Sequence, residues 1–357
     1  MEEGAGGNPL VSPALRKFPY AEFTICAIIR AEISDGRNLC MNIVLLESLG
    51  VTQEVLDSHV KPLLDAGHTF KAYPKTTDVE TLKDEVKDAD VLMLANMPLK
   101  GEVIRAAKNL KYIDIAFTGV DHVDLAAAKE MGVRASNASG YSNESVAELS
   151  VCMMLMLLRN VPQVDARCRE GKTKDGLVGV ELKGKTVGLV GTGAIGQRTA
   201  ELLRAFGCRI IAADTFGGRR PGKPEYIEYM PMDEMLAQAD IVSLHCPLTD
   251  KSRGLINAEA IAKMKPNAVL INVARGPVVD SQALADALNS GRIAGAGIDV
   301  FEIEPPLDTA HPLLHAKNCV VTPHVAFASA ESMNLRAGIV FDNLNKFLNG
   351  EIVNAVL

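Results

Sequence analysis

The 357-residue sequence lacks an excess of basic residues, a cysteine pattern for metal and a long apolar segment. Its formal net charge of −7 argues against nucleic acid or an anionic membrane as a partner, because both need a basic face. The longest apolar run, residues 151–158, is far shorter than the roughly 20 residues that span a bilayer. We therefore expect no nucleic-acid and no membrane partner, and any attraction for an anionic substrate must be local.

The seven cysteines include no C-x-x-C pair and no His/Cys spacing typical of a metal site. They indicate reduced core thiols of a cytoplasmic protein without a metal. Residues 1–40 are rich in small and polar residues and lack a basic stretch followed by an apolar one, so a secretory signal is not expected. We expect them to form an extension outside the fold, which then begins near Met41.

The rest of the chain is long enough for two α/β domains. Strand-like apolar runs alternate with helical patterns, which is typical of parallel sheets. A first series of strands is expected at 42–47, 69–73, 90–95 and 112–116, and a second at 185–191, 209–214, 240–245, 268–274, 294–300 and 318–323. Helices are expected at 143–158, 258–265, 282–290 and 329–349, and the last could return to the first domain.

The second series opens with a pattern typical of dinucleotide binding. Gly191, Gly193 and Gly196 have G-x-G-x-x-G spacing between a strand and a helix, and the next strand ends at Asp214. Such glycines permit a tight turn, a close approach to pyrophosphate and close helix–strand packing, while helix N-terminal amides meet the phosphate charge. Asp214 can bind ribose hydroxyls and would repel a 2′-phosphate, which favours NAD. The arginine pair at 219–220 leaves some NADP use open.

Three further segments place reactive side chains after strands of the second series. Arg275 ends the strand in "INVARGPVVD", "GIDVFEIEPP" supplies Asp299, Glu302 and Glu304, and "TPHVAFAS" supplies His324. Ligands bind at the carboxyl ends of such strands. A forked Arg can hold the carboxylate and carbonyl oxygen of a 2-oxo acid, and a His can protonate that oxygen. A carboxylate can keep the imidazole charged and oriented.

With these segments, the chain resembles the D-isomer-specific 2-hydroxyacid dehydrogenases over Met41–Leu357. The resemblance is carried by "GLVGTGAIG" with Asp214, "SLHCPLT", "INVARGPVVD", "GIDVFEIEPP" and "TPHVAFAS" in that order. It implies that Arg275 is the catalytic, substrate-binding arginine and His324 the acid/base. It also implies that the catalytic carboxylate is Glu304, which directly precedes a proline, rather than Glu302.

The same resemblance implies a fold of two doubly wound parallel-sheet domains with a cleft between them. Residues 41–140 and 329–357 would form a flavodoxin-like substrate domain, and 141–328 a Rossmann NAD-binding domain through which a homodimer is largely built. Residues placed on the cofactor are Gly191, Gly193, Ala194, Ile195, Gly196, Asp214, His245, Cys246, Pro247, Ala274 and Asp299, the last two at the nicotinamide carboxamide. Residues placed on the substrate are Asn96, Met97, Gly119, Val120 and Arg275.

The choice of substrate rests on fewer residues. "SNASGYSNESVAEL" and "PHVAFAS" look most like the glycerate dehydrogenase (hydroxypyruvate reductase) branch. That branch often has N-K-x-P-L where this chain reads Ala95-Asn96-Met97-Pro98-Leu99, so its lysine is missing here. We expect a small 2-oxo acid, hydroxypyruvate or glyoxylate first. Reduction to D-lactate, to D-2-hydroxyisocaproate or of an aryl 2-oxo acid is an alternative. So is 3-phosphoglycerate dehydrogenase, disfavoured because Asn96 and Met97 add no cation and no C-terminal regulatory domain is expected. The alternative of another class is an NAD-sensing, corepressor-like binding protein.

Overall fold

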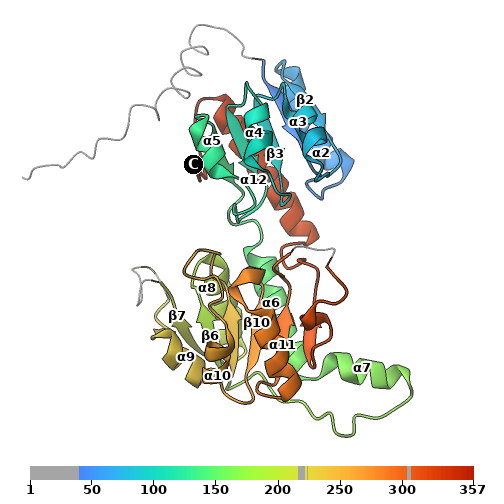
Figure 1. Ribbon diagram of the computed structural model, residues 1–357, viewed down its shortest axis with the longest axis vertical. Coiled ribbons are helices and arrows are strands. Elements are labelled where there is room, and N and C mark those ends of the chain that lie inside the picture. Colours follow the sequence, from blue (N-terminus) through green and yellow to red (C-terminus); the bar gives the residue numbers. More distant parts are fainter. Residues whose placement is uncertain (1–39, 216–221, 223, 304–306) are drawn as a thin grey trace, which may run out of the picture.

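The structure is a computed structural model that describes residues 40–215, 222, 224–303 and 307–357. Two parallel sheets, each with helices on both faces, lie one above the other along the long axis of the molecule (Figure 1). The predicted α/β class with two doubly wound domains is confirmed. Apart from Cys40, the expected extension lies outside the described residues.

The first sheet has five parallel strands in the order β2-β1-β3-β4-β5, which is the flavodoxin-like order. Its strands are β1 (Asn42–Leu45), β2 (Thr69–Ala72), β3 (Val91–Leu94), β4 (Tyr112–Ile115) and β5 (Arg134–Asn137). Its helices are α2 (Gln53–Asp65), α3 (Val79–Val86), α4 (Gly101–Ala106) and α5 (Leu125–Glu130). Strands β3 and β4 are buried throughout because helices cover both faces, which explains their apolar sequences.

The second sheet has seven parallel strands in the order β12-β11-β10-β9-β6-β7-β8. The strands are β6 (Thr186–Val190), β7 (Arg209–Ala213), β8 (Ile227–Tyr229), β9 (Ile241–Leu244), β10 (Val269–Asn272), β11 (Gly295–Ile298) and β12 (Cys319–Val321). The helices are α6 (Asn143–Leu158), α7 (Val161–Arg169), α8 (Ala194–Ala205), α9 (Met232–Gln238), α10 (Ala258–Lys263) and α11 (Ser281–Ser290), with 3₁₀ turns at Gly276–Val278 and Pro312–Leu314. The strand order reverses between β6 and β9, where Rossmann folds bind their ligands.

The last helix, α12 (Ala330–Leu348), begins between the two sheets and runs along the first (Figure 1). Its Phe347 stacks on Tyr112 of β4 with ring centroids 4.3 Å apart. Its Asn343 donates a hydrogen bond to the buried Asp114 at 3.1 Å. We call the first sheet with α2–α5 and α12 the first unit, and the second sheet with α6–α11 the second unit.

The segment after α12 completes the edge of the first sheet. Ala355 pairs with Ser136 of β5 in an antiparallel bridge, and the Asn137 amide donates to the Asn354 carbonyl at 3.1 Å. The first sheet is therefore completed by residues from the opposite end of the described chain.

Most strands lie within the ranges expected from their apolar runs, but β5 and β8 were not predicted. Their sequences, R-A-S-N and I-E-Y, are short and carry no apolar run, so only pairing with β4 and β7 makes them strands. Helix ends follow their capping residues: the Asn257 side chain accepts from the Ala260 amide, and Gly291 ends α11 with φ of 74°.

Helix α6 occupies the expected range, and although its apolar sequence suggests a buried helix, one of its faces is open to solvent and Cys152 on that face is exposed. Within the described residues no single helix is long and apolar enough to cross a membrane; α6 and α7 meet that measure only jointly, across a 62° bend. The six cysteines that the structure describes are free thiols, but Cys40, Cys152 and Cys168 are exposed and the other three are only partly buried. The prediction of core thiols is therefore wrong for these six.

Candidate functional site

A cavity of about 630 Å³ lies at the carboxyl ends of strands from both sheets. Its walls come from the loops that follow β4 in the first unit and β6, β9, β10 and β12 in the second. This volume lies within the usual range for a small-molecule site. The expected site residues on its wall are Gly119, Val120, Gly193, Ala194, Ile195, His245, Cys246, Pro247, Ala274, Arg275 and His324.

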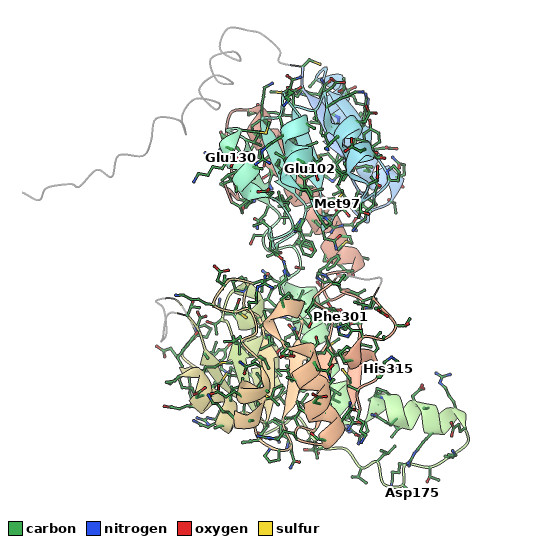
Figure 2. All side chains as sticks on the ribbon, in the orientation of Figure 1. Met97, Glu102, Glu130, Asp175, Phe301 and His315 are labelled. Atoms are coloured by element: carbon green, nitrogen blue, oxygen red, sulfur yellow. The ribbon has the colours of Figure 1, made fainter. Side chains whose placement is uncertain are left out.

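The two units face each other at this level of the molecule. Phe301, in the loop after β11, lies at the end of the second unit that faces the first, whereas Asp175, after α7, lies at the opposite extreme (Figure 2). The cavity therefore lies where the first unit closes over the strand ends of the second.

Arg275 lies three residues after the end of β10, and hydrogen bonds with the Asn272 side chain fix the backbone there. The Asn272 side chain donates to the Arg275 carbonyl at 3.0 Å and accepts from the Ala274 amide at 3.1 Å. The guanidinium donates through Nε to Asp121 Oδ1 at 3.1 Å and through Nη1 to the Ala274 carbonyl at 2.9 Å. Because Asp121 follows β4, this ion pair joins the two units.

Because Gly119 has no side chain, the Arg275 guanidinium can lie directly against its backbone. A Cβ built on Gly119 would lie 1.5 Å from Arg275 Nη2, so any other residue here would displace the fork. Burial alone would raise the pKa of Asp121, but the charge and hydrogen bond of Arg275 outweigh it and the pKa is lowered. Asp121 is therefore ionised at neutral pH and fixes the Nε edge of the guanidinium.

His324 lies beside an aromatic wall. Its ring makes edge-to-face contacts with Phe117, at 5.7 Å between centroids, and with Phe327, at 5.3 Å. The Arg275 guanidinium lies 5.7 Å from the Phe117 ring centroid. Phe117 thus contacts both polar groups, and the sequence prediction that Arg275 and His324 share one cavity agrees with their positions.

The backbone of His324 is held in the left-handed region, with φ of 54°, by a buried carboxylate. Asp299, at the end of β11, accepts hydrogen bonds from Thr322 Oγ1 at 2.5 Å, the Val325 amide at 2.8 Å and the Ala326 amide at 2.9 Å. The His324 amide in turn donates to the Asp299 carbonyl at 2.7 Å. The sequence did not reveal this loop-holding role, whereas a contact between Asp299 and the nicotinamide stays a prediction.

The glycine-rich turn fits a dinucleotide. Gly191 has φ of 89°, and a Cβ on Gly196 would lie 2.3 Å from the Gly191 carbonyl oxygen, so α8 packs closely against the turn. Around Gly193, by contrast, no atom lies within 4 Å of a Cβ position. This space at the start of α8 is where a pyrophosphate would meet the helix N-terminal amides.

Asp214 faces the same turn from the end of β7. Its Oδ2 accepts from the Thr192 amide at 2.9 Å and from Thr192 Oγ1 at 2.7 Å. Burial tends to raise its pKa, but the Thr192 hydrogen bonds outweigh burial and the pKa is lowered. Asp214 is thus a charged acceptor beside the turn.

His245 is a neutral imidazole on the cavity wall. Its Nε2 lies 2.9 Å from Ser243 Oγ, while its buried Nδ1 has no hydrogen-bond partner among the described residues. Burial lowers the pKa of His245 to about 4. A buried polar atom without a partner is costly, so Nδ1 is a candidate contact for a bound cofactor.

Asn96 and Met97 do not lie on this cavity wall. The Met97 amide donates to Glu47 Oε1 at 2.7 Å, and the Asn96 side-chain oxygen accepts from Lys75 at 3.0 Å. Met97 itself is buried in the first unit (Figure 2). The Met97 amide is thus used within the first unit, and the substrate contacts expected for Asn96 and Met97 stay predictions.

Glu304 lies outside the described residues, so its expected place beside His324 stays a prediction. The neighbouring Glu302 binds His311, with 3.2 Å between Oε2 and Nε2. Sequence reasoning also missed Asp121, Tyr141 and Phe327 as cavity residues. The segment "TGVDHVD" marked the region of Asp121, but its pairing with Arg275, 154 residues away, has no sequence signal.

Comparison with known proteins agrees with the family that the sequence motifs indicate. The family described as "D-isomer specific 2-hydroxyacid dehydrogenase, NAD binding domain" matches residues 151–326. A hydroxypyruvate reductase of Blautia hydrogenotrophica is 36% identical over 288 residues, 78% of this chain and 88% of that protein. The chain belongs to the D-isomer-specific 2-hydroxyacid dehydrogenases, as predicted, and is therefore an oxidoreductase with an NAD-binding domain.

A D-3-phosphoglycerate dehydrogenase of Methanocaldococcus jannaschii is 38% identical over 310 residues, and the match covers 86% of this chain but 58% of that protein. Among solved structures, a pyruvate reductase of Chlamydomonas reinhardtii has a TM-score of 0.74 at 35% identity, over 87% of this chain and 97% of its own. An NAD-dependent formate dehydrogenase from Staphylococcus aureus in complex with NAD has a TM-score of 0.78 at 29% identity, over 88% and 98%. An acyclic imino acid reductase in complex with NADPH and D-Arg has a TM-score of 0.80 at 27% identity, and the match covers 89% of this chain and 100% of that protein.

The lowered pKa of His245 predicts a pH dependence of stability. The unfolded chain takes up a proton near pH 6.5 and the folded chain only near pH 4, so stability falls as pH drops through this window, by on the order of 2 kcal/mol given partial exposure. His245→Asn should remove this part of the loss. Urea unfolding at pH 7 and pH 5 checks it, with the exposed His315→Asn as control. Equal pH slopes for His245→Asn and wild type would contradict it.

Proposed function

We propose that this dehydrogenase uses NAD to interconvert a small 2-oxo acid and the corresponding D-2-hydroxy acid, with hydroxypyruvate or glyoxylate as substrate. The observation that carries the proposal is the shared cavity in which Arg275 and His324 both contact Phe117, beside the open turn at Gly193. Reduction of a 2-oxo acid by a dinucleotide requires a forked cation, an imidazole and open space for a pyrophosphate at the turn.

We assign residues 41–140 and 329–357 to the substrate domain and 141–328 to the cofactor domain. Two features support this division. The chain passes between the units once between β5 and α6, and again at the start of α12. Both crossings are short and lie next to the cavity, since Tyr141 and Phe327 line it. A cleft that closes on substrate by a hinge at these crossings fits the arrangement.

The cofactor would be held by residues already in place. The amides of Ala194 and Ile195 open α8 toward the pyrophosphate, Asp214 would accept from the ribose hydroxyls, and His245 Nδ1 would gain its missing partner. When bound, the nicotinamide supplies or accepts the hydride. The charge of Asp214 favours NAD, although proteins similar to this chain are described with NAD and with NADPH.

Arg275 would bind the substrate. Asp121 and the Ala274 carbonyl hold Nε and Nη1, so the guanidinium is already oriented when an anion arrives. Nη2, lying over Gly119, is directed to the first-unit loop where the backbone of Gly119 and Val120 lines the cavity. A carboxylate there would receive donors from both units and draw them together.

His324 would exchange the proton. In reduction the imidazolium donates to the carbonyl oxygen as carbon 2 gains a hydride, and in oxidation the neutral imidazole accepts the hydroxyl proton. Asp299 keeps the ring-bearing loop in place through three hydrogen bonds. We assign Glu304 to keep this imidazole charged, and the binding of Glu302 to His311 is consistent with that choice.

A small unphosphorylated substrate is favoured by the charges near the cavity. Asn96 and Met97 add no cation, and Lys75, which binds Asn96, also pairs with the buried Glu47 at 3.2 Å. A phosphate would therefore meet little net positive charge in this loop. The similarity to hydroxypyruvate reductases, which this chain covers almost end to end, points the same way.

A panel of 2-oxo acids with NADH tests the function. We expect turnover of hydroxypyruvate or glyoxylate, and a loss of about 10²–10⁴-fold in kcat for His324→Asn with NADH binding retained, because the proton donor is lost. NADH oxidation at 340 nm measures turnover and fluorescence measures binding. The exposed His315→Asn is the control, with wild-type rates expected. NADH binding without turnover of any 2-oxo acid would contradict the proposal and favour an NAD-sensing role.

Gly119→Ala tests the position of the guanidinium. The added methyl takes the place of Arg275 Nη2, and because that group ends a flexible side chain, the fold should lose less than about 1 kcal/mol while the fork moves. We expect KM for the 2-oxo acid to rise at least roughly tenfold. Gly338→Ala, on α12 with open space around its Cβ position, is the matched control. An unchanged KM for Gly119→Ala would remove Arg275 from substrate binding.

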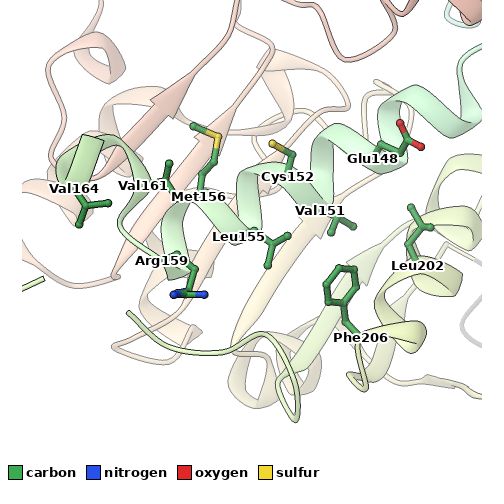
Figure 3. A pocket seen from close by; sticks show the side chains of 10 residues that line it. All are labelled: Glu148, Val151, Cys152, Leu155, Met156, Arg159, Val161, Val164, Leu202 and Phe206. Carbon is green, nitrogen blue, oxygen red and sulfur yellow. The ribbon is translucent and has the colours of Figure 1, made fainter. Parts of the chain in front are cut away.

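We also propose a homodimer through the second unit. Helix α7 projects from this unit and buries none of its own residues (Figure 1). Between α6, α7 and α8 lies an apolar groove of about 680 Å³, with none of its lining residues shared with the cavity at the strand ends and with Val161 and Phe206 exposed (Figure 3). Apolar surface of this kind marks an interaction site.

The groove matches a second copy of itself. Along α6 its lining residues are symmetric about a point between residues 153 and 154: Glu148 mirrors Arg159, Val151 mirrors Met156, and Cys152 mirrors Leu155 (Figure 3). Two antiparallel α6 helices related by a two-fold axis would pair apolar with apolar residues. They would also place each Glu148 opposite the partner's arginine.

Charge reversal tests this pairing. Glu148→Arg should weaken the dimer at least roughly tenfold by opposing like charges, and Glu148→Arg with Arg159→Glu should restore it by exchanging both charges. Sedimentation velocity across micromolar concentrations measures the dissociation. A monomeric wild type, or a double variant as weak as the single one, would contradict the proposed interface.

A further inference from the structure

Three aromatic rings form the wall of the cavity beside His324. The ring centroids of Phe117 and Phe327 are 5.1 Å apart, and that of Tyr141 lies 6.3 Å from the Phe117 centroid and 6.4 Å from the Phe327 centroid. Tyr141 is the member of this wall that carries a polar atom. It is 3% exposed, and its hydroxyl makes no hydrogen bond of full geometry among the described residues, although the side chains of Arg336 and Ser142 lie close enough to offset part of the rise that burial causes in its pKa. A buried hydroxyl without a partner costs about 1–3 kcal/mol unless a ligand supplies one.

A buried cation lies directly behind this wall. The Arg336 guanidinium carbon is 5.6 Å from the Tyr141 ring centroid and 5.8 Å from that of Phe327. Arg336 is 3% exposed and donates to the Leu49 carbonyl at 2.5 Å. Its Nε has no partner, and no carboxylate pairs with it within the part of the chain that the structure describes.

Burying the Arg336 guanidinium without a carboxylate costs folding free energy, so other interactions must compensate for its burial. The two rings supply one part through cation–π contact, which also fixes the ring of Tyr141. Burial raises the pKa of Tyr141 to about 12 against the opposing charge of Arg336, so the phenol keeps its proton. Tyr141 is thus a neutral hydroxyl whose hydrogen-bond donor strength the nearby cation increases.

Under the proposed function, two of the three groups on carbon 2 of the substrate already have partners. The carboxylate faces Arg275 and the loop at Gly119, and the carbonyl oxygen lies between Arg275 and His324. The third group, which begins with carbon 3, is left to face the aromatic wall. A substrate oxygen on that carbon would give the Tyr141 hydroxyl a well-formed hydrogen bond, which no described residue supplies.

We propose, on the basis of that function, that Tyr141 is a specificity-determining residue that binds a hydroxyl on carbon 3 of the 2-oxo acid, and that Arg336 is the positioning residue behind it. The pair selects a 3-hydroxy-2-oxo acid over its 3-deoxy analogue. Sites built to bind a substrate hydroxyl reject the analogue that lacks it, because their own polar group is then left unpaired.

Tyr141→Phe tests the contact. We expect the ratio of kcat/KM for hydroxypyruvate to that for pyruvate to fall about 10- to 100-fold, mainly through KM for hydroxypyruvate. Tyr112→Phe is the matched control, because Tyr112 is also buried with an unpartnered hydroxyl but stacks on Phe347 in the first unit. Its ratio should equal that of wild type.

Arg336→Met tests the positioning role. It should lower the same ratio, and combining it with Tyr141→Phe should lower the ratio little further, because both changes act through one hydroxyl. Additive losses would show that Arg336 acts independently of the Tyr141 hydroxyl, and an unchanged ratio would show that it serves folding alone; either result would overturn its role. Should a variant fail to fold, the wild-type rates of D-glycerate and D-lactate oxidation decide instead, with no preference for D-glycerate overturning the proposal.

The outcomes separate this inference from the function on which it rests. Wild-type turnover of no 2-oxo acid overturns both. Turnover of both hydroxypyruvate and pyruvate, with a ratio that Tyr141→Phe leaves unmoved, overturns only the role of Tyr141 and leaves the proposed dehydrogenase in place.

Discussion

The arrangement of the site depends on one buried carboxylate, that of Asp299. It sits at the end of β11 and accepts two backbone amides and one hydroxyl from the loop after β12. Without these bonds the amides of Val325 and Ala326 would lose their acceptors, and only the bonds of the His324 amide would remain to hold that residue in the left-handed region. The imidazole therefore faces the cavity because a neighbouring strand end dictates the course of its backbone.

A second constraint links the units across the cavity. The Arg275–Asp121 pair is partly exposed, so its own stabilising contribution is modest. Its effect on geometry is larger. The pair fixes the guanidinium close to Gly119 and leaves Nη2 directed to the first unit. Together with Arg336, which joins α12 to the loop after β1, it places cations on both sides of the aromatic wall.

The sequence revealed those parts of the molecule that local pattern determines. Strands buried on both faces, such as β9 and β10, show as apolar runs, and Arg275, His324 and the glycine turn lie in motifs at strand ends. Strand β5, R-A-S-N, could not be read because its neighbour β4 makes it a strand. The Asp121 pairing and the loop-holding role of Asp299 depend on distant contacts. The Met97 amide binds Glu47, since a buried carboxylate needs donors, and no motif records that need.

The tail that completes the first sheet affects how the molecule is made. During translation β4 and β5 leave the ribosome early, yet the helix that covers β4 and the segment that pairs with β5 emerge after the whole second unit. The face around Tyr112 and Asp114 must therefore wait uncovered while the nucleotide-binding half folds. The cofactor-binding half, whose elements are contiguous in the chain, is therefore the part that can fold first, and the first unit is completed only when the last helix and tail arrive.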